Sequence, residues 1–328
     1  MHNYGQKTIK YLVFCPFLYT FAAKQRNMLR QVRPKKNLGQ HFLTDLDIAR
    51  RIADTVDTPF AELPVLEVGP GMGVMTQFLV EKPRELKVVE IDGESVAYLK
   101  ETIFKDQHPT PSTQHPTPNT QHPTPNTQHP TPNTQQIIEG DFLRMNLSEV
   151  FGGRPFIVTG NYPYDISSQI FFHILDYKDL IPCCTGMIQH EVAVRMAASP
   201  GGKEYGILSV LLQAWYDIEY LFRVEPSVFN PPPKVMSAVI RMTRNGVTSL
   251  GCNELLFRRV VKTTFGQRRK MLRVSLRQLV GNDAASLSSR FATMRPEQLS
   301  VADFVELTNL VEREMNAGEN VLCPNTTD

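Results

Sequence analysis

Short apolar runs rich in β-branched residues alternate with helix-like segments from residue 65 to residue 197. The runs predicted as strands are VLEVG (65–69), LKVVEID (86–92), QIIEGD (136–141), FIVTGN (156–161) and TGMIQ (185–189). Strands that are apolar along most of their length and alternate with helices are typical of a parallel sheet covered on both faces. The alternation therefore predicts an α/β fold.

The second half of the chain follows a different pattern. Residues 207–224 are predicted as a helix and a strand, and residues 234–242 as the other strand of a closing antiparallel hairpin. From about residue 248 to residue 316 the pattern is only helical. We therefore expect a sheet domain at 28–248, a small all-helical domain at 249–316 and a tail at 317–328.

The N-terminal residues 1–27 do not fit the alternation. They contain an apolar stretch that is too short to span a bilayer and is interrupted by Pro16. Lys7 and Lys10 precede it, as in a leader peptide. We favour the other interpretation, an upstream extension without a fold of its own before a working start at Met28.

Residues 107–134 repeat the unit QHPTPNT, with QHPTPST as the first copy. Each unit has two prolines and no aliphatic side chain, so it can neither form a helix nor bury a core. We expect an extended insert at about 105–136 in a surface loop that tolerates added length. Its four histidines could hold a metal only weakly, and we predict no metal site; they are His108, His115, His122 and His129.

Composition narrows the class of protein and its compartment. Of 328 residues, 41% are hydrophobic and 21% are charged, as in soluble globular proteins. None of the five cysteines lies in a CxxC pair, which predicts a reducing, cytoplasmic location without a zinc site or a disulfide framework. The net charge of +2 neither indicates nor excludes a nucleic-acid partner.

The first predicted strand leads into the glycine-rich turn EVGPGMG at 67–73. Glycine allows a tight turn and a close approach of the backbone to a ligand. Glu90 and Asp141 end the next two strands at the same sheet edge, where they can accept bonds from ribose hydroxyls and an adenine amino group. These features predict a nucleoside cofactor. The alternatives are a solvated strand end for Glu90 and a helix N-cap for Asp141.

The tetrapeptide Asn161-Tyr162-Pro163-Tyr164 follows the fourth strand. It is similar to the motif of enzymes that methylate planar amino nitrogens. An adenine amino group is a poor nucleophile because its lone pair is delocalised into the ring. The side-chain carbonyl of Asn161 and the main-chain carbonyl of Tyr162 can accept its N–H groups and free that lone pair. Pro163 fixes the backbone, and Tyr164 offers a face for a flipped-out base. The pattern favours this chemistry over a simple turn, and no general base is needed.

These motifs occur together with NLGQHFLTD (37–45), PSVFNPPPKVMSAVIRM (226–242) and FGQRRKMLRVSL (265–276). In this combination the chain resembles the KsgA-type small-subunit (16S) ribosomal RNA adenine N6-dimethyltransferases from about residue 34 to residue 310. The resemblance implies a Rossmann-like methyltransferase sheet that uses S-adenosylmethionine. It also implies N6,N6-dimethylation of two adjacent adenosines in the 3′-terminal hairpin loop of that RNA, during small-subunit biogenesis.

The same resemblance assigns individual residues. The cofactor contacts that it implies are His41, Leu43, Gly69, Gly71, Glu90, Asp141 and Asn161. His41 stands where the family commonly has Asn, and its imidazole can still donate to the cofactor. Tyr162 stands where the family usually has Leu, but only its main-chain carbonyl is needed. Phe229 is a candidate to cover the second face of the target base, with a core aromatic as an equal alternative.

Two basic segments favour contact with RNA over a merely solvated charged face. The residues expected to contact it are Arg33, Lys35, Lys36, Arg258, Arg259, Lys262, Arg268, Arg269, Lys270 and Arg273. Such clusters neutralise phosphates and supply affinity, while the shape of the RNA supplies specificity. We expect small-subunit rRNA or the immature small subunit as partner, no membrane association, and a monomer.

Other functions fit part of the sequence. A large-subunit (23S) rRNA adenine methylase could share the cofactor site and the tetrapeptide, as could a DNA or protein amide methylase with a different recognition domain. A mainly non-catalytic ribosome-assembly factor would not need Glu90, Asp141 and Asn161 intact. The basic segment 265–276 and the proline-rich stretch 231–235 favour the small subunit.

Overall fold

The computed structural model describes residues 34–35, 40–105, 135–282 and 289–322. The N-terminal extension and the QHPTPNT repeats lie outside these ranges, as do Arg33 and Lys36. Our expectations for them therefore stay predictions.

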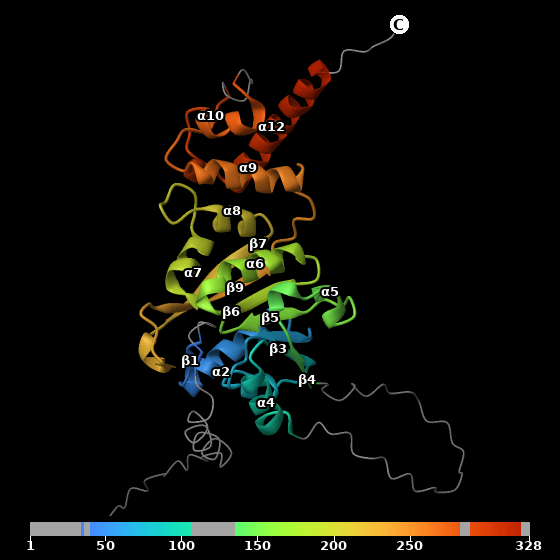
Figure 1. Ribbon diagram of the computed structural model, residues 1–328, viewed down its shortest axis with the longest axis vertical. Coiled ribbons are helices and arrows are strands. Elements are labelled where there is room, and N and C mark those ends of the chain that lie inside the picture. Colours follow the sequence, from blue (N-terminus) through green and yellow to red (C-terminus); the bar gives the residue numbers. More distant parts are fainter. Residues whose placement is uncertain (1–33, 36–39, 106–134, 283–288, 323–328) are drawn as a thin grey trace, which may run out of the picture.

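A seven-stranded sheet with the order β4-β3-β2-β5-β6-β9-β7 lies at the centre of the described chain (Figure 1). Its strands are β2 (Val65–Val68), β3 (Leu86–Glu90), β4 (Gln135–Glu139), β5 (Ile157–Gly160), β6 (Cys183–Gln189), β7 (Tyr216–Val224) and β9 (Ser237–Arg244). The pairs from β4 to β6 are parallel, whereas β9 is antiparallel to both β6 and β7. The predicted α/β sheet and its closing hairpin are confirmed.

Neighbouring side chains along the central strands enter two different cores, because successive residues of a strand point to opposite faces. Val65 and Ile157 belong to a core with helices from the first part of the chain, and Leu66 and Val158 to a core with later helices. The first set is α2 (Leu46–Asp54), α3 (Thr76–Leu79) and α4 (Gly93–Thr102); the second is α5 (Leu147–Val150), α6 (Ser167–Asp176), α7 (His190–Ala197) and α8 (Ile207–Gln213). Helix α3 is short and begins at Thr76, because a turn follows Gly73.

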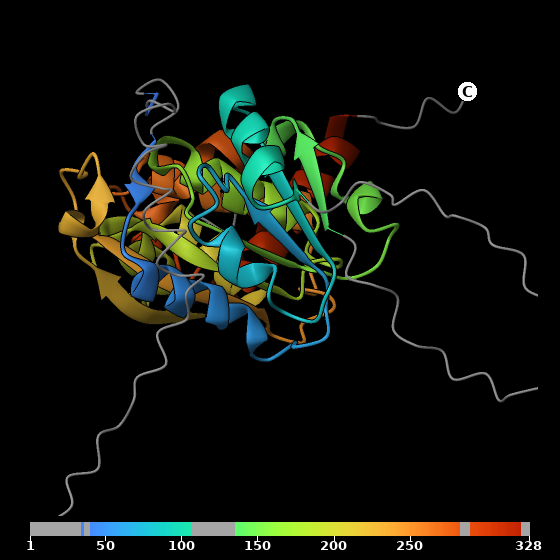
Figure 2. The same cartoon turned by 90° about the horizontal axis from the view of Figure 1, so that it is seen from below.

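The buried side chains of the C-terminal helices join the second core. They are α9 (Glu254–Gly266), α10 (Leu272–Ser275), α11 (Arg277–Val280) and α12 (Val301–Leu322). Phe257 and Leu307 are buried in the same cluster as Leu212 of α8. These helices lie at the end of the molecule opposite α4, which is nearest the viewer in Figure 2. Helix α12 runs to Leu322, so a helix occupies the start of the tail predicted at 317.

Two distant segments meet in a small second sheet. The excursion between β7 and β9 contains β8 (Phe229–Asn230), which pairs antiparallel with β1 (Phe42–Leu43). The main-chain N–H and the hydroxyl of Thr44 both donate to the Val228 carbonyl, at 2.8 and 2.9 Å. This pairing brings residues 40–44 beside the proline-rich loop at 231–233.

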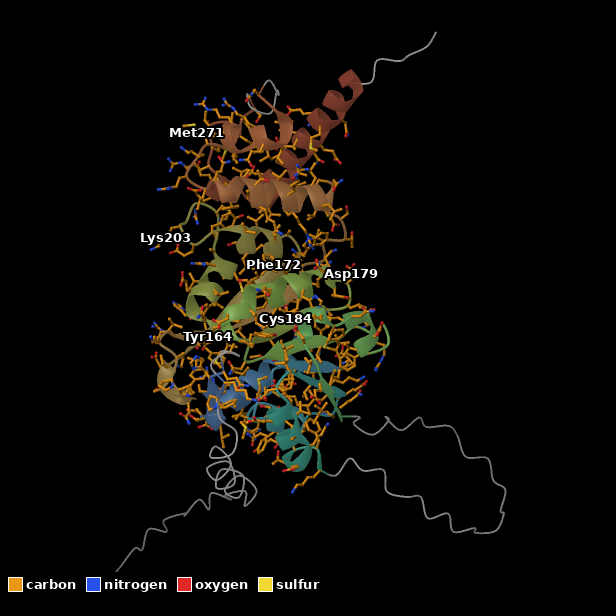
Figure 3. All side chains as sticks on the ribbon, in the orientation of Figure 1. Tyr164, Phe172, Asp179, Cys184, Lys203 and Met271 are labelled. Carbon is orange, nitrogen blue, oxygen red and sulfur yellow. The ribbon has the colours of Figure 1, made fainter. Side chains whose placement is uncertain are left out.

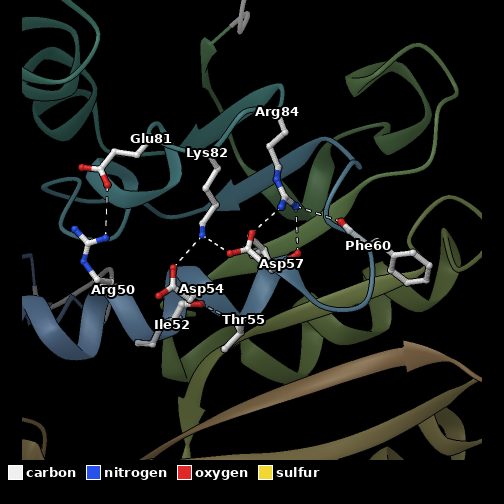
Figure 4. A network of polar contacts seen from close by, with 10 residues as sticks. Arg50, Ile52, Asp54, Thr55, Asp57, Phe60, Glu81, Lys82 and Arg84 are labelled. Carbon is white, nitrogen blue, oxygen red and sulfur yellow. Dashed lines mark hydrogen bonds and ion pairs between the residues drawn. The ribbon is translucent and has the colours of Figure 1, made fainter. Parts of the chain in front are cut away.

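An ion-pair network fixes the end of α2 against the segment before β3 (Figure 4). Lys82 Nζ lies 2.9 Å from Asp54 and 2.6 Å from Asp57, and Arg84 Nη2 lies 2.6 Å from the second oxygen of Asp57. The buried Arg84 also donates to the carbonyls of Val56 and Phe60, both over 3.2 Å. The network anchors α2 beside the sheet.

After α4 the described chain re-enters the sheet at its edge strand. Helix α4 ends at Thr102, and the chain re-enters the sheet at Gln135, the amino end of β4. Strand β4 is the first in the sheet order and, among the described strands, pairs only with β3. Within the described ranges, no helix has the length and apolarity required to cross a membrane. Nor do those ranges hold a group of three or more His, Cys, Asp or Glu side chains suited to a metal ion.

Candidate active site

A cavity of about 320 Å³ opens at the carboxyl ends of β2, β3, β4 and β5. The residues that follow these strands line it, including Gly69, Glu90, Asp141 and Asn161. The strands are neighbours in the order β4-β3-β2-β5, so their ends meet at one edge of the sheet. Pockets in open α/β sheets form at this edge. The residues predicted from the ends of four separate strands therefore meet in one cavity.

Two glycines of the turn after β2 are required by its geometry. Gly71 has a φ of 54°, and a Cβ there would lie 3.1 Å from the ring of Phe42. Gly73 has a φ of 72°, and a Cβ there would lie 2.2 Å from the side chain of Ile103. Larger residues would strain the backbone. The turn is held close to β1 and α4, and its backbone faces the cavity.

Glu90 is 5% exposed and organises the loops around it. Its Oε2 accepts the N–H of Gly71 at 3.0 Å, and its Oε1 accepts the N–H groups of Ile91 and Asp92, both at 2.9 Å. Burial raises the pKa of the Glu90 carboxyl, and the three N–H donors partly offset this rise. A carboxylate has about four acceptor positions, so Glu90 retains capacity for a ribose hydroxyl.

Asp141 has the N-cap role considered for it and also lies on the cavity wall, where the predicted bond to an adenine amino group would form. Its Oδ1 accepts the N–H of Leu143 at 3.0 Å and caps the 3₁₀ turn at 142–144, and the residue also lines the cavity. Ile91 lies on the cavity lip with 55% of its surface exposed. The sequence analysis assigned Ile91 no role. The signal that could have found it is an apolar residue directly after Glu90. It can cover a flat heterocycle.

The tetrapeptide separates its side chains between the core and the cavity. Asn161 Nδ2 donates to the main-chain carbonyl of His41 at 3.2 Å. Tyr162 is fully buried, with its N–H donated to Met187 O at 3.0 Å. Pro163 has a φ of −56°, and the hydroxyl of Tyr164 is hydrogen-bonded to that of Ser237. All four residues of the tetrapeptide line the cavity.

The three predicted site residues from β1 and β8 have different environments. His41 is half-buried on the cavity wall, and its Nδ1 donates to Pro231 O at 2.8 Å. Leu43 is 4% exposed and also lines the cavity. Phe229 is 4% exposed, packs in the core with Phe42, and is not among the lining residues. Its position agrees with the core alternative, because β8 turns the ring inward.

Glu67 is a polar residue of the cavity that sequence reasoning left without a role. It is 1% exposed in β2, and its Oε2 has no hydrogen-bond partner in the described structure. Burial raises the pKa of the Glu67 carboxyl to about 8, and the charge of Glu90 adds to this rise. The raised pKa favours the protonated form of this residue of the cavity wall near neutral pH.

Several basic residues expected to contact RNA also contact groups of the protein. Lys35 Nζ lies 2.6 Å from Asp92 and 3.2 Å from Glu94, so its charge is committed to the start of α4. Arg258 pairs with Asp176 at 2.6 Å. Arg268 donates to Gly202 O at 3.0 Å and is half-buried. These partners lie close in the folded chain but far away in the sequence, so the sequence alone could not predict the contacts.

The remaining basic residues lie exposed on α9, on the loop to α10 and on α10 itself. They are Arg259, Lys262, Arg269, Lys270 and Arg273. Lys262 lies 5.8 Å from the centre of the Phe172 ring, whereas the structure gives the other four no ion pair within its described ranges. Nitrogen-tipped side chains extend outward around Met271 in Figure 3. This exposed set forms a basic surface on the C-terminal helices.

The parallel sheet, the cavity at its carboxyl edge and the tetrapeptide on β5 define an S-adenosylmethionine-dependent methyltransferase. The sequence model of the family described as ribosomal RNA adenine dimethylase matches residues 31–114 and 121–313. The chain belongs to this family.

Relatives and solved structures agree with this assignment. The chain is 59% identical over 287 residues to "Ribosomal RNA small subunit methyltransferase A" of Bacteroides thetaiotaomicron, covering 88% of this chain and 97% of the relative. It is 53% identical over 286 residues to the protein of the same name from Porphyromonas gingivalis, covering 87% and 100%.

Two solved structures share the fold. The dimethyladenosine transferase from Plasmodium falciparum has a TM-score of 0.64 and 21% identity, covering 84% of this chain and 98% of that one. The 23S rRNA methyltransferase ErmE has a TM-score of 0.55 and 24% identity, covering 83% and 99%. At these identities the likeness concerns the fold alone.

Proposed function

We propose that the protein transfers methyl groups from S-adenosylmethionine to N6 of two adjacent adenosines in the 3′-terminal hairpin loop of small-subunit (16S) rRNA. The observation that carries this proposal is the orientation of the Asn161 amide beside the nucleoside pocket. Its nitrogen is occupied by the His41 carbonyl, which leaves its oxygen as an acceptor for an amino group. The names of the relatives support the small subunit over the large subunit.

The cavity has groups suited to each part of the donor. Glu90 would accept ribose hydroxyls, Asp141 would accept the adenine amino group, and Ile91 would cover the adenine ring. The neutral Glu67, with an unpartnered buried oxygen, adds a polar group deeper in the same cavity. When bound, the donor supplies an electrophilic methyl on its sulfonium. The residues present therefore fit this cofactor.

Asn161 and Tyr162 would activate the target amine. Two acceptors, the Asn161 Oδ1 and the Tyr162 main-chain oxygen, can draw the two N–H groups of an adenine amine out of the ring plane. The nitrogen lone pair is then free for in-line attack, so positioning supplies most of the acceleration. The amine becomes acidic only once it carries the new methyl, and water can take the proton. Tyr164 would support the flipped base.

The exposed basic surface on the C-terminal helices would hold RNA. Arg259, Arg269, Lys270 and Arg273 can each neutralise a phosphate without first breaking an ion pair. We assign this role to a helical domain at 249–316, which packs on α8 and so has a fixed position relative to the cavity. We further propose that the protein acts as a monomer in the cytoplasm, on the immature small ribosomal subunit.

The test is methylation of purified small subunits that lack the modification, with isotopically labelled S-adenosylmethionine and mapping of the labelled nucleosides. We expect label in dimethyladenosine at two adjacent positions of the terminal hairpin. Large subunits and DNA are offered in parallel reactions, and label confined to 23S rRNA, to DNA or to protein would identify one of the rival methylases. No incorporation, with tight binding to the subunit, would identify an assembly factor without catalysis.

A further inference from the structure

The wall of the cavity beside the tetrapeptide is built from two chain segments joined by His41. The β1–β8 pairing and the two bonds from Thr44 to Val228 O hold residues 42–44 against residues 228–230. His41 continues this line of contacts toward the cavity, because its Nδ1 lies 2.8 Å from Pro231 O. His41 is the member of this line of contacts that borders the cavity.

His41 also contacts two members of the tetrapeptide. Its main-chain carbonyl accepts the Asn161 Nδ2 at 3.2 Å, and its ring stacks on Tyr164 with centroids 5.7 Å apart and planes at 26°. A carbonyl can only accept, so Nδ1 of His41 must carry the proton that it donates to Pro231. The contact therefore fixes the tautomer as well as the position of the ring.

These contacts decide which atom of the Asn161 amide faces the ligand. A flipped amide would place its oxygen 3.2 Å from the His41 carbonyl oxygen, a pairing of two acceptors without a proton. The backbone of residue 41 thus selects the orientation in which Oδ1 is free. The side chain of the same residue ties that backbone to Pro231, on a segment 190 residues away.

We propose that His41 is a positioning residue for methyl transfer: its bond to Pro231 holds the backbone that orients Asn161 and the ring that supports Tyr164. This inference rests on the proposed function and adds to it. It differs from a role as a cofactor contact, which would alter donor affinity instead of the rate at saturation.

Two substitutions separate the hydrogen bond from the ring. His41→Asn keeps an amide nitrogen at the place of Nδ1 and loses the ring, whereas His41→Phe keeps a ring and loses the donor. His190→Phe is the matched control: His190 Nδ1 is hydrogen-bonded to the Tyr220 hydroxyl at 3.0 Å, and the residue does not line the cavity. Each variant is compared with the wild type as the full chain.

Three measurements are made on each variant. Single-turnover methylation of undermethylated small subunits is followed with donor and subunits both saturating, donor Kd is measured by calorimetry, and hydrogen exchange is measured for residues 226–236. For His41→Phe we expect a rate about tenfold lower, a donor Kd changed by less than about twofold, and faster exchange at 226–236. His41→Asn should keep the wild-type exchange and a rate within about threefold of wild type.

A wild-type saturated rate for His41→Phe would overturn the proposal, as would a loss explained entirely by weaker donor binding. Unchanged exchange at 226–236 in His41→Phe would overturn it as well. If the wild type labelled no adenosine, the proposed function would fail instead. The exchange comparison would still decide whether His41 holds the Pro231 segment, so the two failures are distinguishable.

Discussion

The hydroxyl of Tyr162 donates to the main-chain carbonyl of Thr185 over 2.8 Å, with its side chain fully buried. Gly186 makes this possible, because a Cβ there would lie 2.7 Å from the Tyr162 ring. The ring thus fills a space created by the next residue of β6. Members of the family usually have Leu at this position. In this chain the side chain of Tyr162 bonds the tetrapeptide to the neighbouring strand β6.

Tyr162→Phe should lower the free energy of unfolding by about 1–2 kcal/mol, because it leaves the buried Thr185 carbonyl without its donor. Urea unfolding measures the change. Tyr177→Phe is the control: its hydroxyl makes an exposed bond of 3.4 Å to Asn146, and its loss should cost less than about 0.5 kcal/mol. Equal effects for the two variants would show that the Tyr162 bond is not special.

Asn161→Ala should reduce the saturated methyl-transfer rate by about 10²-fold or more, as for the loss of one positioned acceptor in the transition state. RNA affinity should stay near normal, because the phosphate contacts that we propose lie on the C-terminal helices. Single-turnover methylation and filter binding measure the two quantities. Asn309→Ala removes an exposed amide that bonds to Gly251 O and serves as the control. A normal saturated rate for Asn161→Ala would show that the tetrapeptide is only a turn, without a role in methyl transfer.

Glu90→Gln should weaken binding of S-adenosylmethionine at least about tenfold, roughly 1.4 kcal/mol. One acceptor oxygen becomes an NH₂ group that faces the N–H donors now bound to the carboxylate and cannot accept a ribose hydroxyl. Calorimetry gives the affinity. Glu139→Gln, at the exposed end of β4, should leave it unchanged. An unchanged Kd for Glu90→Gln would remove this residue from the donor site.

Glu67→Gln should stabilise the cofactor-free protein increasingly as pH rises. The pKa of Glu67 is about 8 in the folded chain against an ordinary 4.5, so the folded state binds the extra proton between these values. Wild-type stability is therefore lost as pH rises through this window. The advantage of the variant in unfolding free energy should grow by more than about 1 kcal/mol from pH 5 to pH 9.

The comparison is made by urea unfolding at several pH values. Glu101→Gln, which alters an exposed carboxylate of α4, should show no growing difference from the wild type. Parallel curves for wild type and Glu67→Gln would mean that Glu67 is ionised in the folded protein.

Arg269, Lys270 and Arg273 replaced together by Ala should weaken binding to small subunits by about tenfold or more and lower the salt slope by about two to three. All three are exposed, so the thermal midpoint should stay near that of the wild type. Salt-dependent filter binding measures the effect. Lys100→Ala, on α4 at the remote end, should change neither affinity nor slope.

Arg268→Ala gives the contrast within the same segment. Its side chain donates to Gly202 O and lies 3.8 Å from Glu297, so its removal should lower stability as well as charge. If the variant with Arg269, Lys270 and Arg273 replaced by Ala bound RNA normally, the basic surface would be a solvated charged face without a role in RNA binding.

The residues that sequence predicted best are those whose position follows from strand order alone. Glu90 ends a strand, and Gly69, Asp141 and Asn161 come just after one; parallel strands bring these carboxyl ends to one edge. The alternation of strands and helices therefore predicted both the sheet and most of its cavity.

What could not be predicted depends on contacts between distant segments. The β1–β8 pairing buries Phe229 and places His41 against Pro231, and neither segment shows a strand pattern of useful length. Lys35 looked free in a basic stretch, yet Asp92 lies 2.6 Å away in the folded chain. Such pairings are set by packing of the whole chain, which a local pattern does not encode.

The repeats precede Gln135, the amino end of β4, whereas the groups that line the cavity lie at the carboxyl ends of the strands. Each repeat unit corresponds to a whole number of codons, so the gain or loss of a unit preserves the reading frame. A change in the number of units would therefore keep the reading frame, and the chain would still re-enter the sheet at Gln135, away from the edge that carries the cavity.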